Sequence, residues 1–337
     1  MSDIRINNIT NKVGDSGPTI AGVSTVSTSA FMVMPSGDTA IRGAGSGRML
    51  TMGGFGNSPN NTNLNQIQLL TISTTGDATD FGDMSRARYV ASTCASSTRG
   101  IAAGGTPSTS AIDYTIISSS GGANDFGNLR EEKQNAAGLS DATRGVFAGG
   151  YVNPIAQVTA IDFITIATIG ESSSFGNLIE KKQNIAACAS PTRGIIFGGH
   201  TPSTTDAIEF LTIATGGDAQ DFGDLMNGSR QGAGLSNTTR GVHAGGSGSL
   251  KHIAYITIAT TGNALDFGDL SSGAGWLGSG ASSARGIFAG GYASPVGLNR
   301  IEYVTIATTG DATDFGDLIG PAVYGCIGLT DVHGGLG

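Results

Sequence analysis

Short stretches in which apolar and polar residues alternate recur along most of the chain. In residues 160–168, AIDFITIAT, Ile161 and Phe163 fall on one face of an extended strand, and Ile164 and Ile166 fall on the other. Alternation with a period of two and many β-branched residues predicts a strand, and apolar residues on both faces indicate that it is packed on both sides. Because no segment shows a sustained helical period with caps, we expect an all-β fold.

The alternating stretches belong to a repeat with a period of 45 to 49 residues. Each copy contains a Phe-Gly dipeptide, whose Phe residues are Phe81, Phe126, Phe175, Phe222, Phe267 and Phe315. Each copy also contains a Gly-Gly pair, and an Arg lies six residues before the second Gly: Arg48, Arg99, Arg144, Arg193, Arg240 and Arg285. A repeat of this length is stronger evidence for the architecture than any single motif.

One repeat divides into four short strands, here named A to D. Strand A is NAAGLS (135–140), strand B is VFAGG (146–150), strand C is AIDFITIAT (160–168), and strand D is SFGNL (174–178). Four strands in about 40–50 residues is the spacing of a β-propeller blade. The small residues of strand A suit the crowded centre of a ring of blades, and the larger residues of strands C and D suit its rim.

The twin Gly, the Arg and the aromatic residue of strand D resemble kelch repeats, with Phe-Gly where kelch repeats usually have Trp. The resemblance covers residues 37–337 and implies a kelch-like propeller. The chain has six C–D pairs but seven A–B-like stretches. We therefore expect six blades, with Tyr324–Leu329 closing the ring against the first blade; seven blades, the last completed by N-terminal strands, are the alternative.

Composition narrows the classes of function. The 337 residues include 55 Gly, 18 Lys and Arg, and 26 Asp and Glu, for a net charge of −8. This balance argues against nucleic-acid binding, which needs clustered cations. No apolar run is long enough to span a membrane, and the polar start, MSDIRINNIT, lacks the apolar core of a secretory signal.

The residues that look chemically active are better explained by the fold. Asp-Phe-Gly occurs five times, which is typical of a folding element and not of the single metal-binding motif of a kinase. We expect its Asp, including Asp314, to cap backbone N–H groups in the turn before strand D, while weak calcium at these acidic turns stays an alternative. We expect no other cofactor and no enzymatic activity, because no nucleophile motif or His/Cys metal spacing is present.

The faces of the expected ring differ in their variability. The A–B and C–D turns share one face, so we expect the repeat Arg to pair with the acidic C–D turns. The B–C and D–A connections share the other face, and the B–C loops vary most. Variable loops on a rigid scaffold are typical of a recognition surface. The candidate recognition residues are Tyr151, Asn153, His200, Tyr292, Asn299 and Arg300.

Residues 1–36 lack the repeat and read as an extended arm. This leader followed by the repeats resembles virion structural proteins of tailed marine bacteriophages, of the cyanophage type. The resemblance implies a fibre, tail or capsid appendage, made in the host cytoplasm and bound to other virion proteins through residues 1–36. Our leading hypothesis is that residues 37–337 are displayed outward for host attachment to a surface glycan or protein, and a homo-oligomer stays open. A kelch-type interaction adaptor and a carbohydrate-active propeller enzyme are the alternative functions.

Overall fold

The fold was examined in a computed structural model that describes residues 47–56, 61–154 and 156–336. The chain divides into two units, Met1–Ala44 and Gly45–Gly337. The predicted arm, residues 1–36, lies outside the described residues. No helix of the described part is both long and apolar enough to cross a bilayer.

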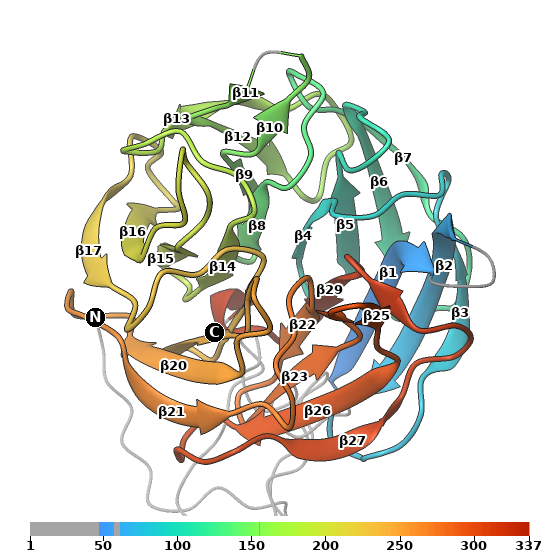
Figure 1. The fold of residues 1–337 in the computed structure, drawn as a ribbon. Coiled ribbons are helices and arrows are strands. Elements are labelled where there is room, and N and C mark those ends of the chain that lie inside the picture. The colour runs from blue at the N-terminus through green and yellow to red at the C-terminus, as the bar shows by residue number, and fades with distance from the viewer. Residues whose placement is uncertain (1–46, 57–60, 155, 337) are drawn as a thin grey trace, which may run out of the picture. The chain divides into compact units, whose positions relative to one another are not determined.

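The second unit is a ring of six four-stranded antiparallel blades (Figure 1). This confirms the predicted six-bladed all-β propeller. The inner strands are β29 (Ile327–Thr330), β4 (Ser92–Ala95), β8 (Ala137–Ser140), β14 (Ala186–Ala189), β18 (Ala233–Ser236) and β22 (Gly278–Ala281). The second strands, each beginning at the repeat Arg, are β1 (Arg48–Gly56), β5 (Arg99–Ala103), β9 (Arg144–Ala148), β15 (Arg193–Phe197), β19 (Arg240–Ala244) and β23 (Arg285–Ala289).

The outer half of each blade holds the alternating strand and the Phe-Gly strand. The third strands are β2 (Thr62–Thr71), β6 (Ala111–Ile116), β12 (Ala160–Thr165), β16 (Ala207–Thr212), β20 (His252–Thr257) and β26 (Arg300–Thr305). The outermost strands are β3 (Thr79–Asp83), β7 (Asn124–Asn128), β13 (Ser173–Asn177), β17 (Gln220–Asp224), β21 (Leu265–Asp269) and β27 (Thr313–Asp317). The third strand carries a register shift where it meets the outermost strand, as between Ile301 and Glu302.

The C-terminal segment closes the ring. Strand β29 pairs with β1, with Leu329 opposite Leu50, and a short strand β28 (Val323–Tyr324) pairs with the end of β1. Blade 1 is therefore built from both ends of the described chain, and β29 lies between β22 and β4. The predicted closure by Tyr324–Leu329 is confirmed. Blades 2 to 6 follow in chain order and begin at β4, β8, β14, β18 and β22.

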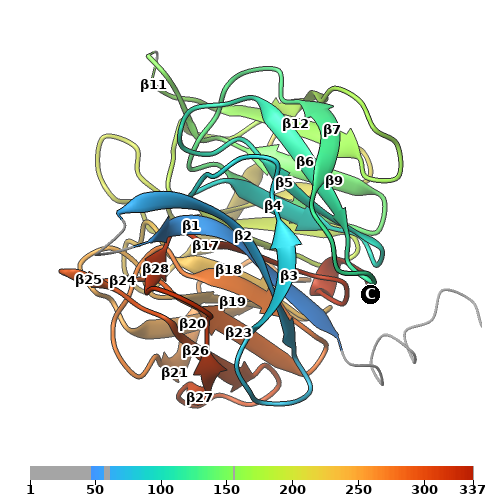
Figure 2. The same ribbon diagram turned by 90° about the vertical axis from the view of Figure 1, so that its right-hand side faces the viewer.

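The hydrophobic core lies between the blades. The described residues form six buried clusters, and each cluster takes its residues from two neighbouring blades. One, for example, joins Val146 and Ile161 of blade 3 to Ile196 and Leu211 of blade 4. This arrangement explains why the third strand is apolar on both faces, because each face packs against a different neighbour. Figure 2 shows the stacked blades from the side.

Close approach between blades requires small residues. A Cβ at Gly138 of β8 would come within 2.2 Å of the carbonyl oxygen of Thr93 on the adjacent inner strand. The Gly of the Phe-Gly strand meets the next blade in the same way: a Cβ at Gly316 would lie 2.5 Å from the carbonyl of Gly76. Phe315 itself is buried at the rim, edge-to-face with Tyr303.

Three shorter features complete the fold. Hairpin β10 (Tyr151–Val152) and β11 (Ala156–Gln157), and hairpin β24 (Tyr292–Ala293) and β25 (Val296–Gly297), extend from the ends of β9 and β23. A 3₁₀ turn, η1 (Gly334–Leu336), contacts the inner strands β8, β14 and β18. Each feature adds to one of the two faces of the ring.

Candidate functional site

The two faces of the ring carry different connections. We call the face with the A–B and C–D turns the turn face, and the face with the B–C and D–A connections the loop face. The antiparallel order within each blade puts these pairs of connections at opposite ends of the strands.

On the turn face, the repeat Arg side chains form hydrogen bonds to the following blade. Each guanidinium Nη1 donates to main-chain carbonyls just after the third strand of that blade, at 2.9–3.1 Å; Arg240, for example, binds Ile306 and Ala307. The hydrogen bonds from Arg285 to the carbonyls of Ile72 and Ser73 join blade 6 to blade 1. Among the described residues none of these Arg forms an ion pair, so the expected Arg–carboxylate ring is wrong. Carbonyls at the strand end are nearer and otherwise unpaired acceptors.

An aromatic residue of the third strand supports five of the six Arg side chains. The guanidinium carbon lies 4.6–5.2 Å from the ring centroid of Tyr114, Phe163, Phe210, Tyr255 or Tyr303. Blade 1 has Leu69 at this position, two residues before the partner of Arg48, so Arg48 lacks the ring. Cation–π contacts of this kind contribute about 0.5–1 kcal/mol each at exposed sites.

The acidic turns also join blades, but through different residues than expected. Asp311 Oδ1 accepts the backbone N–H of Asp269 on the preceding blade, and Asp77 does the same for Asp317. The expected cap, Asp314, is instead an exposed residue within β27, opposite Glu302. The correction follows from the strand boundary: β27 begins at Thr313, so the turn ends before Asp314.

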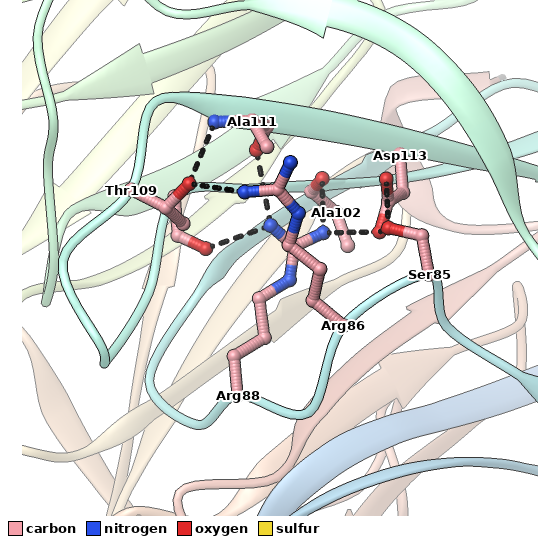
Figure 3. A network of polar contacts seen from close by, with 8 residues as sticks. Ser85, Arg86, Arg88, Ala102, Thr109, Ala111 and Asp113 are labelled. Carbon is pink, nitrogen blue, oxygen red and sulfur yellow. Dashed lines mark hydrogen bonds and ion pairs between the residues drawn. The ribbon is translucent and has the colours of Figure 1, made fainter.

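Below the loop face, charged residues are buried in pairs. In blade 2, Arg88 Nη2 lies 2.8 Å from Asp113 Oδ2, and the same guanidinium binds the carbonyls of Ala102, Gly104 and Ala111 (Figure 3). Lys133 with Asp162 in blade 3 and Lys182 with Glu209 in blade 4 repeat the arrangement at 2.7 and 2.5 Å. Burial lowers the pKa of Arg88, while Asp113 opposes that shift.

The remaining blades replace this pair. Blade 1 has Val323 and Gln68, and the Gln68 amide bonds both main-chain groups of Ile319. Blade 5 has Ser229 and Ala254, and the cross-strand partner of Ala254 is a buried His243, which lies against Phe197. Burial lowers the pKa of His243 to about 4. In blade 6, Glu302 is paired with Arg300 on its own strand at 2.8 Å.

At the centre of the loop face, six residues form a closed circle of hydrogen bonds. Each has a positive φ of 48–64° and donates its backbone N–H to the carbonyl of the equivalent residue on the preceding blade, at 2.6–3.1 Å. We call this circle the mouth ring; its members are Val90, Asn135, Asn184, Gln231, Trp276 and Gly325. It surrounds a hollow of about 90 Å³ whose walls include Ile185 and Leu277.

The hollow shares wall residues with a cavity of about 160 Å³ between the inner strands. The far end of this cavity reaches His333, whose Nε2 lies 2.9 Å from the carbonyl of Ala95 and 3.3 Å from Ser140 Oγ. Cys94 and Cys188 also line it, and burial raises the pKa of both thiols, that of Cys188 to about 12. Cys326 lies just before β29, and Leu329 stands in that strand at the position that Cys94 holds in β4.

Around one half of the mouth lies a cluster of aromatic side chains that we call the aromatic crescent: Phe55, Tyr89, Trp276, Tyr292 and Tyr324. Tyr324 is its hub, since its ring centroid lies 5.1–6.2 Å from those of the four others. All five side chains are half-buried, so each is partly open to solvent. Burial, and then the neighbouring Tyr89 and Tyr292, raise the pKa of Tyr324.

The other half of the mouth carries amides. Asn135, Asn184 and Gln231, which we call the amide arc, are half-buried members of the mouth ring. None of their side-chain amides forms a hydrogen bond within the described part of the chain, and neither do the hydroxyls of Tyr89, Tyr292 and Tyr324. The loop face thus combines apolar ring surfaces with unengaged neutral donors and acceptors.

Three of the six candidate recognition residues are equivalent positions on this face. Tyr151, His200 and Tyr292 each follow the Gly-Gly pair of their blade and bridge to the residue beside the mouth ring. Asn153 and Asn299 are exposed on neighbouring loops. Arg300 differs, since its guanidinium turns to Glu302 and to Ser272 and is half-buried.

Of the aromatic crescent, only Tyr292 is among the recognition residues predicted from the sequence. From the sequence, Tyr324 is expected only in the closing strand, Phe55 lies in a variable B–C loop, and the single Trp has no assigned role. The available signal was position: Tyr89 and Tyr324 each directly precede a mouth-ring residue at matching places in their repeats, and Trp276 is itself the mouth-ring residue of its repeat. No group of three His, Cys, Asp or Glu suited to a metal is found among the described residues. No protein-family model matches the chain, and no curated protein matches its sequence.

Proposed function

We propose that this protein is a non-enzymatic structural component of a phage particle, a fibre, tail or capsid appendage. Residues 1–36 would attach it to other virion proteins, and the propeller would present its loop face to the host surface. The observation that carries the display role is that the polar side chains of the two faces are bonded differently. The repeated charged residues of the turn face bind main-chain groups of adjacent blades, whereas on the loop face the side-chain amides of the amide arc and the Tyr hydroxyls of the crescent form no hydrogen bond within the described residues.

The virion setting is supported by the sequence. The leader followed by the repeats resembles virion structural proteins of tailed marine bacteriophages, and both parts occur in the same order. A ring closed by its own C-terminal strand suits a displayed module, because each inner strand packs between two neighbouring inner strands and the edges that remain are short.

The absence of catalysis is supported by the state of the ionisable groups. The buried carboxylates Asp113, Asp162 and Glu209 are each neutralised by a buried cation, and the thiols of Cys94 and Cys188 have raised pKa values. Groups held in this way serve packing rather than proton transfer or nucleophilic attack.

Particle incorporation tests the proposal. The full chain and a variant lacking residues 1–36 would be supplied in turn to host cells that assemble particles of a phage deleted for this gene. The full chain should co-purify with particles, and the shortened chain should remain in the unassembled fraction with the same thermal unfolding midpoint. Incorporation of the shortened chain would refute anchoring through residues 1–36. Release of reducing ends from polysaccharides, abolished by one carboxylate substitution, would refute the non-enzymatic assignment.

A further inference from the structure

Some residues of the mouth ring are of types that disfavour the backbone conformation they adopt. All six members have left-handed φ values, a conformation that Gly and Asn accept readily and that β-branched and bulky residues disfavour. Gly325, Asn135 and Asn184 meet this requirement. Val90 and Trp276 do not, with φ values of 48° and 55°. Strained residues that the fold does not require are typical of functional surfaces.

Trp276 also destabilises the fold in a second way. Its indole Nε1 is shielded from solvent and has no hydrogen-bond partner among the described residues. An unpaired buried donor is rare and destabilising. The chain's single Trp therefore stands at a strained backbone position with an unpaired N–H, beside Tyr292 and Tyr324. Folding alone would favour Asn here, as in blades 3 and 4.

The surface around the mouth is free of acidic side chains and carries one cation without an acidic partner among the described residues, the half-buried Arg230, which contacts Ser247 and His200. The mouth ring, the residues that precede it and the residues that follow each Gly-Gly pair include no Asp or Glu, although the chain has 26. The cations nearest to this surface in blades 2 to 4 are buried with acidic partners. A charged polymer such as a nucleic acid would therefore find few complementary charges here.

From these features we infer that the loop face binds a neutral saccharide. Pyranose rings have an apolar C–H face that packs on aromatic rings and an edge of hydroxyls that both donate and accept hydrogen bonds. The aromatic crescent supplies the ring surfaces, and the Tyr hydroxyls and the amide arc supply groups that donate and accept. One sugar ring lies on Trp276 and Tyr292, and its hydroxyls reach Asn135 and Asn184 across the hollow of the mouth ring.

This inference rests on the proposed function only in taking the loop face as the displayed surface. The site itself needs neither the particle nor residues 1–36. Its failure would leave the virion role standing, and exclusion of the chain from particles would leave the saccharide site standing.

The single Trp makes the test specific to the site. The full chain would be titrated with chitotriose, cellotriose and maltotriose while the emission of Trp276 is followed, and with a polyanionic control, polygalacturonate. A saturable change with at least one neutral trisaccharide, and none with the polyanion, is the expected result. No saturable change with any of the three neutral probes, or a response to the polyanion alone, would overturn the inference.

Variants separate binding from ring closure, because the crescent also lies where β28 meets β1. Tyr292→Ala should weaken trisaccharide binding about tenfold by emission titration. Trp276→Asn, followed by calorimetry, should abolish it. Ile169→Ser, at an exposed apolar residue of the turn face, should bind as the unsubstituted chain does. If Tyr292→Ala and Trp276→Asn lowered the unfolding midpoint while the affinity stayed unchanged, the crescent would be a closure device and the inference would be wrong.

Discussion

The turn face and the loop face are built by the same six blades, but their charged side chains lie in different places and bind different partners. On the turn face the Arg and Asp side chains remain near the surface and bind main-chain groups of the adjacent blade. Near the loop face three charged pairs of blades 2 to 4 lie beneath the surface, and the side chains of the mouth are mostly neutral, while charged residues such as Glu131 and Lys181 stay exposed on the D–A connections. A contact that holds blades together can repeat unchanged, whereas a recognition surface needs different groups around the ring.

The buried residue pair below the loop face also varies from blade to blade. A charged pair is therefore not required at this position. Blades 2 to 4 use ion pairs, blade 1 uses Val323 with Gln68, and blade 5 uses Ser229 with Ala254. A buried pair is costly to desolvate and often exchangeable for a neutral pair, but one partner alone is strongly destabilising. The comparison between the faces can therefore be tested by substitutions in each layer.

The largest effect is expected from Lys182→Val in blade 4. It leaves Glu209 as an unpaired buried carboxylate and should lower the free energy of unfolding by about 3–5 kcal/mol in denaturant titrations. The double variant Lys182→Val/Glu209→Gln copies the residues of blade 1 and should recover most of this loss, since Gln can still accept from Ile179 N–H. Equal losses in both variants would show that packing of the Lys side chain, rather than charge, dominates.

Blade 5 allows the same layer to be probed with pH. The pKa of His243 is lowered from 6.5 to about 4, so below pH 6.5 the unfolded chain binds a proton that the folded chain does not. Stability should therefore fall as the pH drops from about 6.5 to 4, by about 2 kcal/mol at pH 5 relative to pH 7. His243→Phe, the residue type at the same place in blades 3 and 6, should remove this part of the acid dependence. Unfolding titrations of both proteins at pH 7 and 5 measure the difference, and identical pH profiles would contradict it.

A smaller effect is expected on the turn face. Arg240→Ala removes two hydrogen bonds to carbonyls of blade 6 and the contact with Tyr255, and should cost about 1–3 kcal/mol. Arg48 makes one such bond, to Ile117, and has no aromatic ring beneath it. Arg48→Ala is therefore the matched control and should cost less by thermal unfolding. Neither substitution should alter the emission response of Trp276 to a trisaccharide.

The sequence predicted most of the frame because the frame repeats. The period located the strands, the Phe residues identified the rim, and the spare A–B stretch at Tyr324–Leu329 predicted the closing strand. It failed where the partner of a side chain lies on another blade. Charge alone made the acidic turns the natural partners of Arg144, but the main-chain carbonyl of Ile213 is closer in three dimensions. The aromatic crescent was missed for the same reason, since Phe55 and Tyr324 come together only when the two ends of the ring meet.

The smallest change in stability should come from the loop face, at Trp276→Asn. The substitution gives up packing against Tyr292 and Tyr324, but it also relieves a left-handed backbone that costs roughly 1–2 kcal/mol for a bulky residue, and it removes the unpaired indole N–H. These contributions oppose one another, so the free energy of unfolding should stay within about 1 kcal/mol of the unsubstituted value. Asn135→Ala in blade 3 is a useful reference, because it places a residue that disfavours this backbone where Asn now fits, and it should be destabilising. If Trp276→Asn instead destabilised the ring by as much as Lys182→Val, the loop face would be as structural as the layer beneath it, and the distinction between the two faces would fail.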